Sequence, residues 1–142
     1  MTLRFLVDTD VISETARSSP NEAVVGWLAA EDTIALAAIT VYELARGVET
    51  APAGKRRRFL EEWLGRVLAS SIAIVPFDRE TALAAARLGT AFQRRGRTID
   101  THDLFIAASA SVRGLAVATR NVPHFRGLGL SVFDPFTKTY AI

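Results

Sequence analysis

The feature that most constrains the fold is an alternation of short apolar runs with longer segments of helical periodicity. The apolar runs have the length of β-strands and cover residues 4–8, 33–39, 71–77, 115–119 and 130–134. They are apolar at successive positions, which is typical of parallel strands buried on both faces by helices. With right-handed crossovers, this order predicts an α/β fold, namely a three-layer α/β/α sandwich around a central parallel sheet of about five strands.

The segments between these runs carry apolar residues at spacings of three and four, which predicts helices. Gly96 and Gly114 each follow such a segment and act as helix stop signals. The segment before Gly114 is apolar nearly all round, so we expect that helix to be buried. The expected helices cover residues 10–17, 21–30, 41–50, 54–69, 79–95 and 102–113, with a short turn of helix at 121–125.

The composition limits the kind of protein. A chain of 142 residues is expected to form a single domain over residues 1–142. There is no cysteine, which excludes disulfides and thiolate metal sites. The sequence has neither the apolar core of a signal peptide nor an apolar run that could cross a bilayer, so we expect a cytoplasmic protein without membrane contacts.

The net charge of +2 is too small to indicate a nucleic-acid partner by itself. One basic cluster, "KRRR" at residues 55–58, is expected to be a solvated helix face. Arg57 and Arg58 stand four residues before Glu61 and Glu62, a spacing at which opposite charges pair on a helix.

Several polar residues fall where strands end or where the following helix begins. Asp8 ends the first strand, Glu43 lies in the first turn of the helix after the second strand, and Asp103 opens the buried helix. Thr119 and Asn121 follow the fourth strand directly. All five map to the carboxyl edge of a parallel sheet, where open α/β folds bind ligands. They converge if the strand order brings the first, second and fourth strands together.

Clustered carboxylates repel one another unless a cation joins them, and oxygen ligands without cysteine favour Mg²⁺ or Mn²⁺. Such ions lower the pKa of a bound water and stabilise phosphoryl displacement. The alternative is that each acid caps a helix: Asp8 near residue 10, Glu43 in a capping box with Thr40, and Asp103 at the helix dipole. Acids that border buried elements are costly without partners, which favours the binding site.

Four stretches, "FLVDTDVISE", "ITVYELARGVE", "THDLFIAASA" and "AVATRNVPHF", resemble in order the four motif blocks of PIN-domain ribonucleases. The resemblance covers nearly the whole chain and is greatest to the VapC and FitB-like toxins of bacterial toxin–antitoxin pairs. It implies an endoribonuclease that depends on Mg²⁺ or Mn²⁺ and cleaves RNA. It also implies a cognate antitoxin as partner and a homodimer, with a larger assembly when the antitoxin is bound.

The resemblance also implies roles for individual residues. Asp8, Glu43 and Asp103 match the catalytic, metal-binding carboxylates. Thr119 matches the supporting hydroxyl, and Asn121 matches a position where Asn or Asp is usual.

Other positions depart from the family pattern. His124 stands where a fourth acid is common, which weakens a second metal site; alternatively it caps the turn after Asn121. Asp10 stands where Asn is frequent and is expected to order the next turn or support the site, while Asp100 is expected to be a helix cap.

Residues 94–97, "RRGR", lead toward Asp103 and are expected to meet the RNA backbone.

Two other functions remain open. "DTDV" also resembles the Asp-x-Asp pair of haloacid-dehalogenase-like phosphatases, with Asp8 as nucleophile and Asp10 as acid/base, although a suitable Lys and a downstream acid pair are missing. His124 leaves room for a catalytically weak PIN-like module that only binds RNA or an antitoxin.

Overall fold

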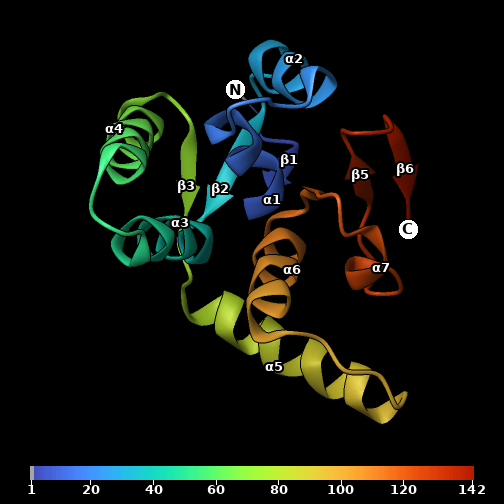
Figure 1. Ribbon diagram of the computed structural model, residues 1–142. Helices are drawn as coiled ribbons and strands as arrows, with labels where there is room; N and C mark the ends of the chain where they lie inside the picture. The colour runs from blue at the N-terminus through green and yellow to red at the C-terminus, as the bar shows by residue number, and fades with distance from the viewer. Residues whose placement is uncertain (1) are drawn as a thin grey trace.

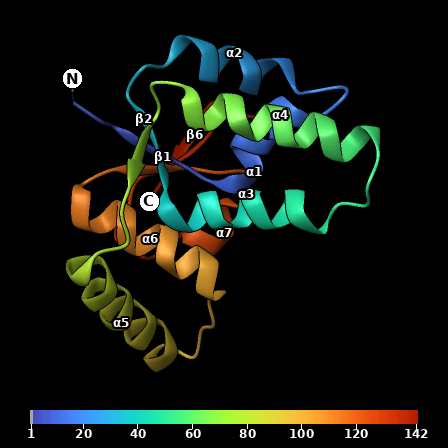
Figure 2. The same cartoon turned by 90° about the vertical axis from the view of Figure 1, so that its left-hand side faces the viewer.

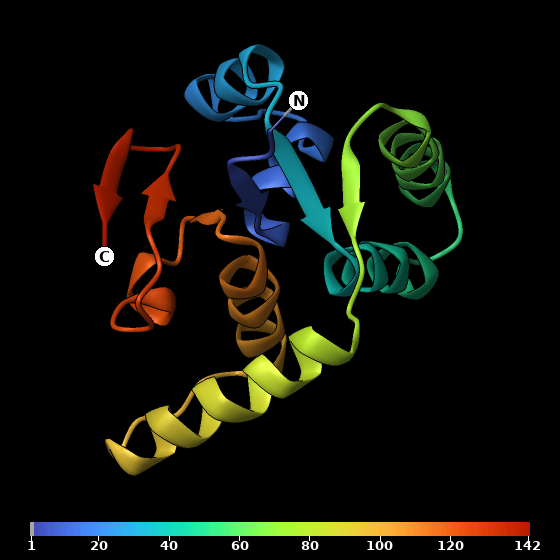
Figure 3. The ribbon, with the colours of Figure 1, turned by 180° about the vertical axis from the view of Figure 1, so that it is seen from behind.

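A computed structural model describes residues 2–142 and contains one six-stranded sheet. Its strand order is β3-β2-β1-β4-β5-β6, and β3 and β6 form the two edges (Figures 1 and 3). Neighbouring strands from β3 to β5 are parallel, and β6 is antiparallel to β5. The strands are β1 Phe5–Val7, β2 Ile34–Ala37, β3 Ala73–Val75, β4 Ala116–Ala118, β5 Val132–Asp134 and β6 Thr139–Ala141.

The helices lie on both sides of this sheet, which confirms the predicted α/β fold. Figure 2 shows α2 and α4 on one side of the strands and α5 and α6 on the other. In the described residues 2–142, no helix is long and apolar enough to cross a membrane. The helices are α1 Thr9–Ile12, α2 Glu22–Ala30, α3 Ala38–Thr50, α4 Lys55–Ala69, α5 Arg79–Arg94, α6 Thr101–Arg113 and α7 Val122–Phe125, with a 3₁₀ helix η1 at Ser13–Ala16.

The apolar side chains of the strands are buried in two clusters, one on each face of the sheet. Successive residues of β1 alternate between them: Leu6 packs with α5, α6 and α7, whereas Phe5 and Val7 pack with α1, α2 and α4. Phe5 and Val7 share their cluster with Trp63 of α4. Because β1 is covered on both faces, its carboxyl end is held in place by packing from both sides.

The junction between β2 and α3 differs from the prediction. We expected a strand over 33–39 and a helix from 41, but β2 ends at Ala37 and α3 begins at Ala38 without a loop. Thr40 therefore lies inside the first turn, fully buried, and its hydroxyl has no hydrogen-bond partner. The alternative in which Glu43 forms a capping box with Thr40 is wrong, because the helix starts before Thr40. Glu43 was predicted in the first turn of this helix but lies in its second turn.

The strand β6 was not predicted. It follows a turn in which Lys138 has a φ of 59°, and its Tyr140 packs on Phe133 of β5 at 4.7 Å between ring centroids. Its Tyr140 side chain is 62% exposed. A three-residue exposed edge strand has too little apolar pattern to be recognised in the sequence.

Candidate active site

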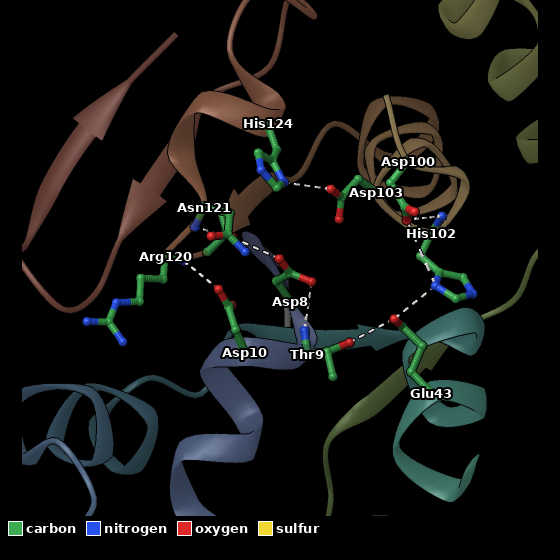
Figure 4. Close-up of polar contacts among 11 residues, drawn as sticks. Asp8, Thr9, Asp10, Glu43, Asp100, His102, Asp103, Arg120, Asn121 and His124 are labelled. Atoms are coloured by element: carbon green, nitrogen blue, oxygen red, sulfur yellow. Dashed lines mark hydrogen bonds and ion pairs between the residues drawn. The ribbon is translucent and has the colours of Figure 1, made fainter. Parts of the chain in front are cut away.

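The strand order places β1, β2 and β4 side by side, as the predicted convergence of the polar residues requires. β1 lies between β2 and β4, so the residues that follow β1 and β4 are neighbours at the carboxyl edge. The second turn of α3, which carries Glu43, and the first turn of α6 reach the same region. Figure 4 shows Asp8 between Asp103, Glu43 and Asn121.

Asp8 is the most buried acid of this group, at 5% exposure. Its Oδ1 accepts a hydrogen bond of 2.8 Å from the backbone N–H of Thr9 and caps α1. Its Oδ2 accepts a bond of 2.8 Å from the hydroxyl of Thr119. Burial, followed by the nearby charge of Asp10, raises the pKa of Asp8 from 3.8 to about 7. The side chain does cap a helix, yet its charge remains poorly compensated.

Asp10 lies beside Asp8 and also carries unfavourable charge. Its Oδ2 accepts a bond of 3.2 Å from the backbone N–H of Arg120, while its buried Oδ1 has no hydrogen-bond partner. Burial raises the pKa of Asp10 to about 6, with further contributions from the charges of Asp103 and Asp134. Asp10 thus ties the turn after β4 to α1 and adds negative charge to the cluster.

Glu43 is held by both of its carboxylate oxygens. Oε1 accepts a hydrogen bond of 2.8 Å from the hydroxyl of Thr9, and Oε2 lies 3.2 Å from Nδ1 of His102. His102 follows Asp100, which caps α6 as expected by accepting from the His102 N–H at 2.9 Å. His102 was not predicted as a site residue, because a histidine in a first helical turn has no distinctive pattern.

Asp103 is paired with the other histidine of the chain. Its Oδ2 lies 2.8 Å from Nδ1 of His124, whose side chain is 56% exposed, whereas that of Asp103 is 17% exposed. His124 also donates its backbone N–H to the carbonyl of Asn121 at 3.0 Å. Its ring is directed at the acid (Figure 4), so this position lies at the edge of the cluster.

Thr119 connects Asp8 to Asn121. It is fully buried, donates its hydroxyl hydrogen to Asp8, and accepts the backbone N–H of Asn121 at 3.0 Å. Asn121 precedes α7 and is exposed. The hydroxyl therefore fixes the rotamer of the buried carboxylate.

The group has the donor chemistry of a divalent-cation site. Asp8 and Asp10 have raised pKa values, Asp10 has an unpartnered buried oxygen, and no Lys or Arg of residues 2–142 forms an ion pair with either. In the same described range, no three acidic or histidine side chains are already arranged to hold an ion, and Glu43 and Asp103 are each engaged by a histidine. Oxygen ligands that lack a compensating cation fit Mg²⁺ or Mn²⁺.

Within residues 2–142, no arginine of either basic cluster forms an ion pair with these acids. Arg57 pairs with Glu61 at 3.7 Å, as predicted, and with Glu49 at 3.5 Å. In the second cluster, Arg95 donates to the carbonyl of Gly127 at 3.0 Å and Arg97 to that of Arg126 at 3.2 Å. These two arginines hold the loop after α7.

The chain is similar to proteins of known family. A family model described as PIN domain matches residues 5–125. A VapC ribonuclease, Y4jK of Sinorhizobium fredii, is 38% identical over 135 residues, which is 92% of this chain and 96% of the relative. The structure of FitAcB from Neisseria gonorrhoeae superposes with a TM-score of 0.86 at 38% identity, covering 93% of this chain and 98% of the other. That of VapBC-5, a toxin–antitoxin system of Mycobacterium tuberculosis, has a TM-score of 0.66 at 26% identity, covering 85% and 86%.

Proposed function

Because the chain belongs to the PIN-domain family, we propose that it is an endoribonuclease and the toxin of a toxin–antitoxin pair. The observation that carries the proposal is the meeting of Asp8, Glu43 and Asp103 at the carboxyl edge of the sheet (Figure 4). They lie far apart in the sequence, and each comes from a different element. Relatives that are named ribonucleases and toxins cover almost the full length of the chain.

Asp8, Glu43 and Asp103 would hold Mg²⁺ or Mn²⁺. When bound, such an ion supplies an acidified water and neutralises charge at the phosphodiester. The residues of this chain orient the acids: the Thr119 hydroxyl fixes Asp8, and the Thr9 hydroxyl fixes Glu43. Cation binding has to displace any proton held by Asp8, whose pKa is about 7, so loading is expected to weaken below neutral pH.

The structure offers less support for a phosphatase of the haloacid-dehalogenase type. In that mechanism Asp10 has to transfer a proton to the leaving group. Here one oxygen of Asp10 accepts the backbone N–H of Arg120 and the other is buried. Neither oxygen is free to reach a substrate without a rearrangement of the turn after β4.

The test is cleavage of a structured and an unstructured RNA by the purified protein, in Mg²⁺, in Mn²⁺ and in EDTA, with Asp8→Asn as the matched variant. We expect cleavage that requires a divalent ion and is lost in the variant. Hydrolysis of p-nitrophenyl phosphate, measured in parallel, should remain at background. Hydrolysis of this phosphomonoester without RNA cleavage would support the phosphatase, and RNA binding without either activity would support a binding module.

An apolar groove between α2 and α4 is the surface that we propose for the antitoxin. It has a volume of about 670 Å³ and includes Leu28, Trp63 and Val67. A second hollow of about 300 Å³ shares Trp63 and extends to Thr9 and Glu43. A protein segment lying along both would bury apolar surface and cover one of the acids, which suits an inhibitor of the nuclease.

We also propose that the protein forms a homodimer. Phe77, in the segment before α5, and Leu83, within α5, are 38% and 49% exposed. The rings of Phe77 and Phe105 of α6 pack with their centroids 4.5 Å apart. Such an exposed apolar patch suits contact with a second copy. Light scattering of the purified chain measures this directly, and a Leu83→Glu variant should be monomeric.

A further inference from the structure

Beside the acid cluster lies a small, partly open cavity that none of the roles described above uses. Its volume is about 160 Å³, and it lies between the start of α6 and α7. Pockets for drug-sized ligands span roughly 300–1,000 Å³, so this cavity suits a single planar ring system and not a whole nucleotide. Its lining includes Arg97, Ile99, Asp100, Asp103, Pro123 and His124.

The positively charged side chain in the cavity lining, Arg97, is held in place by its neighbours. The guanidinium of Arg97 lies over the ring of buried Phe92, 4.2 Å from its centroid, and Nη1 donates to the carbonyl of Arg126 at 3.2 Å. A Cβ at Gly127, whose φ is +82°, would lie only 2.8 Å from this Nη1. A side chain at residue 127 would therefore push the guanidinium away from its present position, in addition to the strain of a positive φ. The guanidinium retains other N–H groups for a ligand.

The charged side chains that line the cavity limit the kind of ligand that can bind there. Arg97 is accompanied by the carboxylates of Asp100 and Asp103, so a second phosphate group would be repelled at this side of the site. A neutral heterocycle with both donors and acceptors matches this mixed lining. Single-stranded RNA bases stack on aromatic rings and guanidinium planes, and the half-exposed His124 ring and Arg97 offer both.

We propose that this cavity binds one unpaired base of the RNA, next to the phosphodiester held by the acid cluster, and that Arg97 contributes to sequence preference. The inference rests on the proposed ribonuclease function, because Asp103 belongs to both the cavity and the acid cluster. It adds a specificity pocket whose walls come from the segment 97–100 and from α7.

The test uses short single-stranded RNAs of one sequence in which each position in turn is abasic. In the wild-type protein, one position near the cleaved bond should lower kcat/KM by about tenfold when abasic, the loss of roughly one base stack. Arg97→Gln, and Thr98→Trp, which fills the cavity from its rim, should lower kcat/KM for intact RNA and remove the dependence on that base. Arg95→Gln is the matched control, because Arg95 holds the same loop through Gly127 without lining the cavity.

Fluorescence anisotropy with the same RNAs and the inactive Asp8→Asn variant gives a second readout that does not depend on turnover. A tenfold weaker Kd for the RNA with the critical abasic position, lost on adding Arg97→Gln, supports the pocket. An equal effect of Arg95→Gln and Arg97→Gln, or no abasic position that matters, overturns it. Absence of RNA cleavage by the wild type would refute the proposed function, while the anisotropy comparison would still decide the pocket.

Discussion

Replacing Asp8 by Asn should stabilise the metal-free protein, although the side chain is buried and hydrogen-bonded. Burial and Asp10 raise the pKa of Asp8 from 3.8 to about 7. At 1.36 kcal/mol per pH unit this difference is worth ~4 kcal/mol, an upper limit for the cost of the charge above neutral pH. Asn retains an oxygen for the Thr9 N–H and an amide that can donate to the Thr119 hydroxyl. We expect a net gain of roughly 1–3 kcal/mol at pH 8.

The pH dependence distinguishes this effect from simple repacking. Between pH 3.8 and about 7 the folded protein keeps a proton on Asp8 that the unfolded chain has lost, so wild-type stability falls as the pH rises through this window. Below the window the carboxyl is neutral in both states and the variant gains little. Urea unfolding of both proteins in EDTA, from pH 4 to pH 8.5, should show a difference that grows to about pH 7 and then levels off.

Asp78 provides the matched control, because it caps α5 in solvent. Hydrogen bonds from Thr81 lower the pKa of Asp78, with a further contribution from the charge of Arg113. The ionised Asp78 therefore stabilises the fold above pH 3.8, and this stabilisation is lost as the pH falls through the lower pKa of the folded state. Asp78→Ala should therefore destabilise the protein at neutral pH and lose its effect in acid. A loss of stability in Asp8→Asn at every pH, or a pH-independent difference, would refute the electrostatic reasoning.

Four further results are expected. Glu43→Gln and Asp103→Asn should each lower RNA cleavage by about a hundredfold or more with a retained circular dichroism spectrum, since they remove charges that would hold the ion; cleavage near the wild-type rate would exclude these acids from the site. EDTA should abolish cleavage, Mg²⁺ or Mn²⁺ should restore it, and either ion should raise the Tm of the wild type by mass action; activity that is insensitive to EDTA would rule out the metal mechanism. His124→Asp should tighten Mg²⁺ binding in a calorimetric titration, because it places a hard oxygen ligand beside Asp103; an unchanged titration would show that this position lies outside the metal site. Val67→Glu in the groove should abolish antitoxin binding, measured by co-purification, and leave RNA cleavage intact. The control Leu68→Glu, at an exposed position of the same helix, should leave both antitoxin binding and RNA cleavage unchanged. Normal binding by the groove variant would place the antitoxin elsewhere.

Much of the fold could be predicted because β1, β2 and β4 are short runs buried on both faces. Burial of this kind leaves a continuous apolar pattern, and the acids at the ends of these runs identify the carboxyl edge. The start of α3 could not be located, since Ala37 forms the junction without a capping side chain. Strand β6 was missed because its pairing depends on β5 and on a turn at Lys138 with positive φ.

The contacts within the site were less predictable than its location. One oxygen of the Glu43 carboxylate accepts the hydroxyl of Thr9, and the other lies beside His102. These contacts join segments whose relative placement depends on the packed sheet. The positions of Arg95 and Arg97 likewise follow from the path of the loop at 126–127. Charge and spacing alone suggested that both side chains would be free for RNA.

The central position of β1 also affects when the acid cluster can form during synthesis. β1 pairs with β2, which is made early, and with β4, whose residues are Ala116–Ala118 near the other end of the chain. A nascent polypeptide of one hundred residues contains Asp8 and Glu43 but lacks Asp103, α6 and the strand that carries Thr119 beside Asp8. Because domains of this size fold as units once their long-range strand partners are available, the acid cluster can assemble only after β4 has been synthesised. Nascent chains that stop before α6 and β4 therefore lack the complete acid cluster.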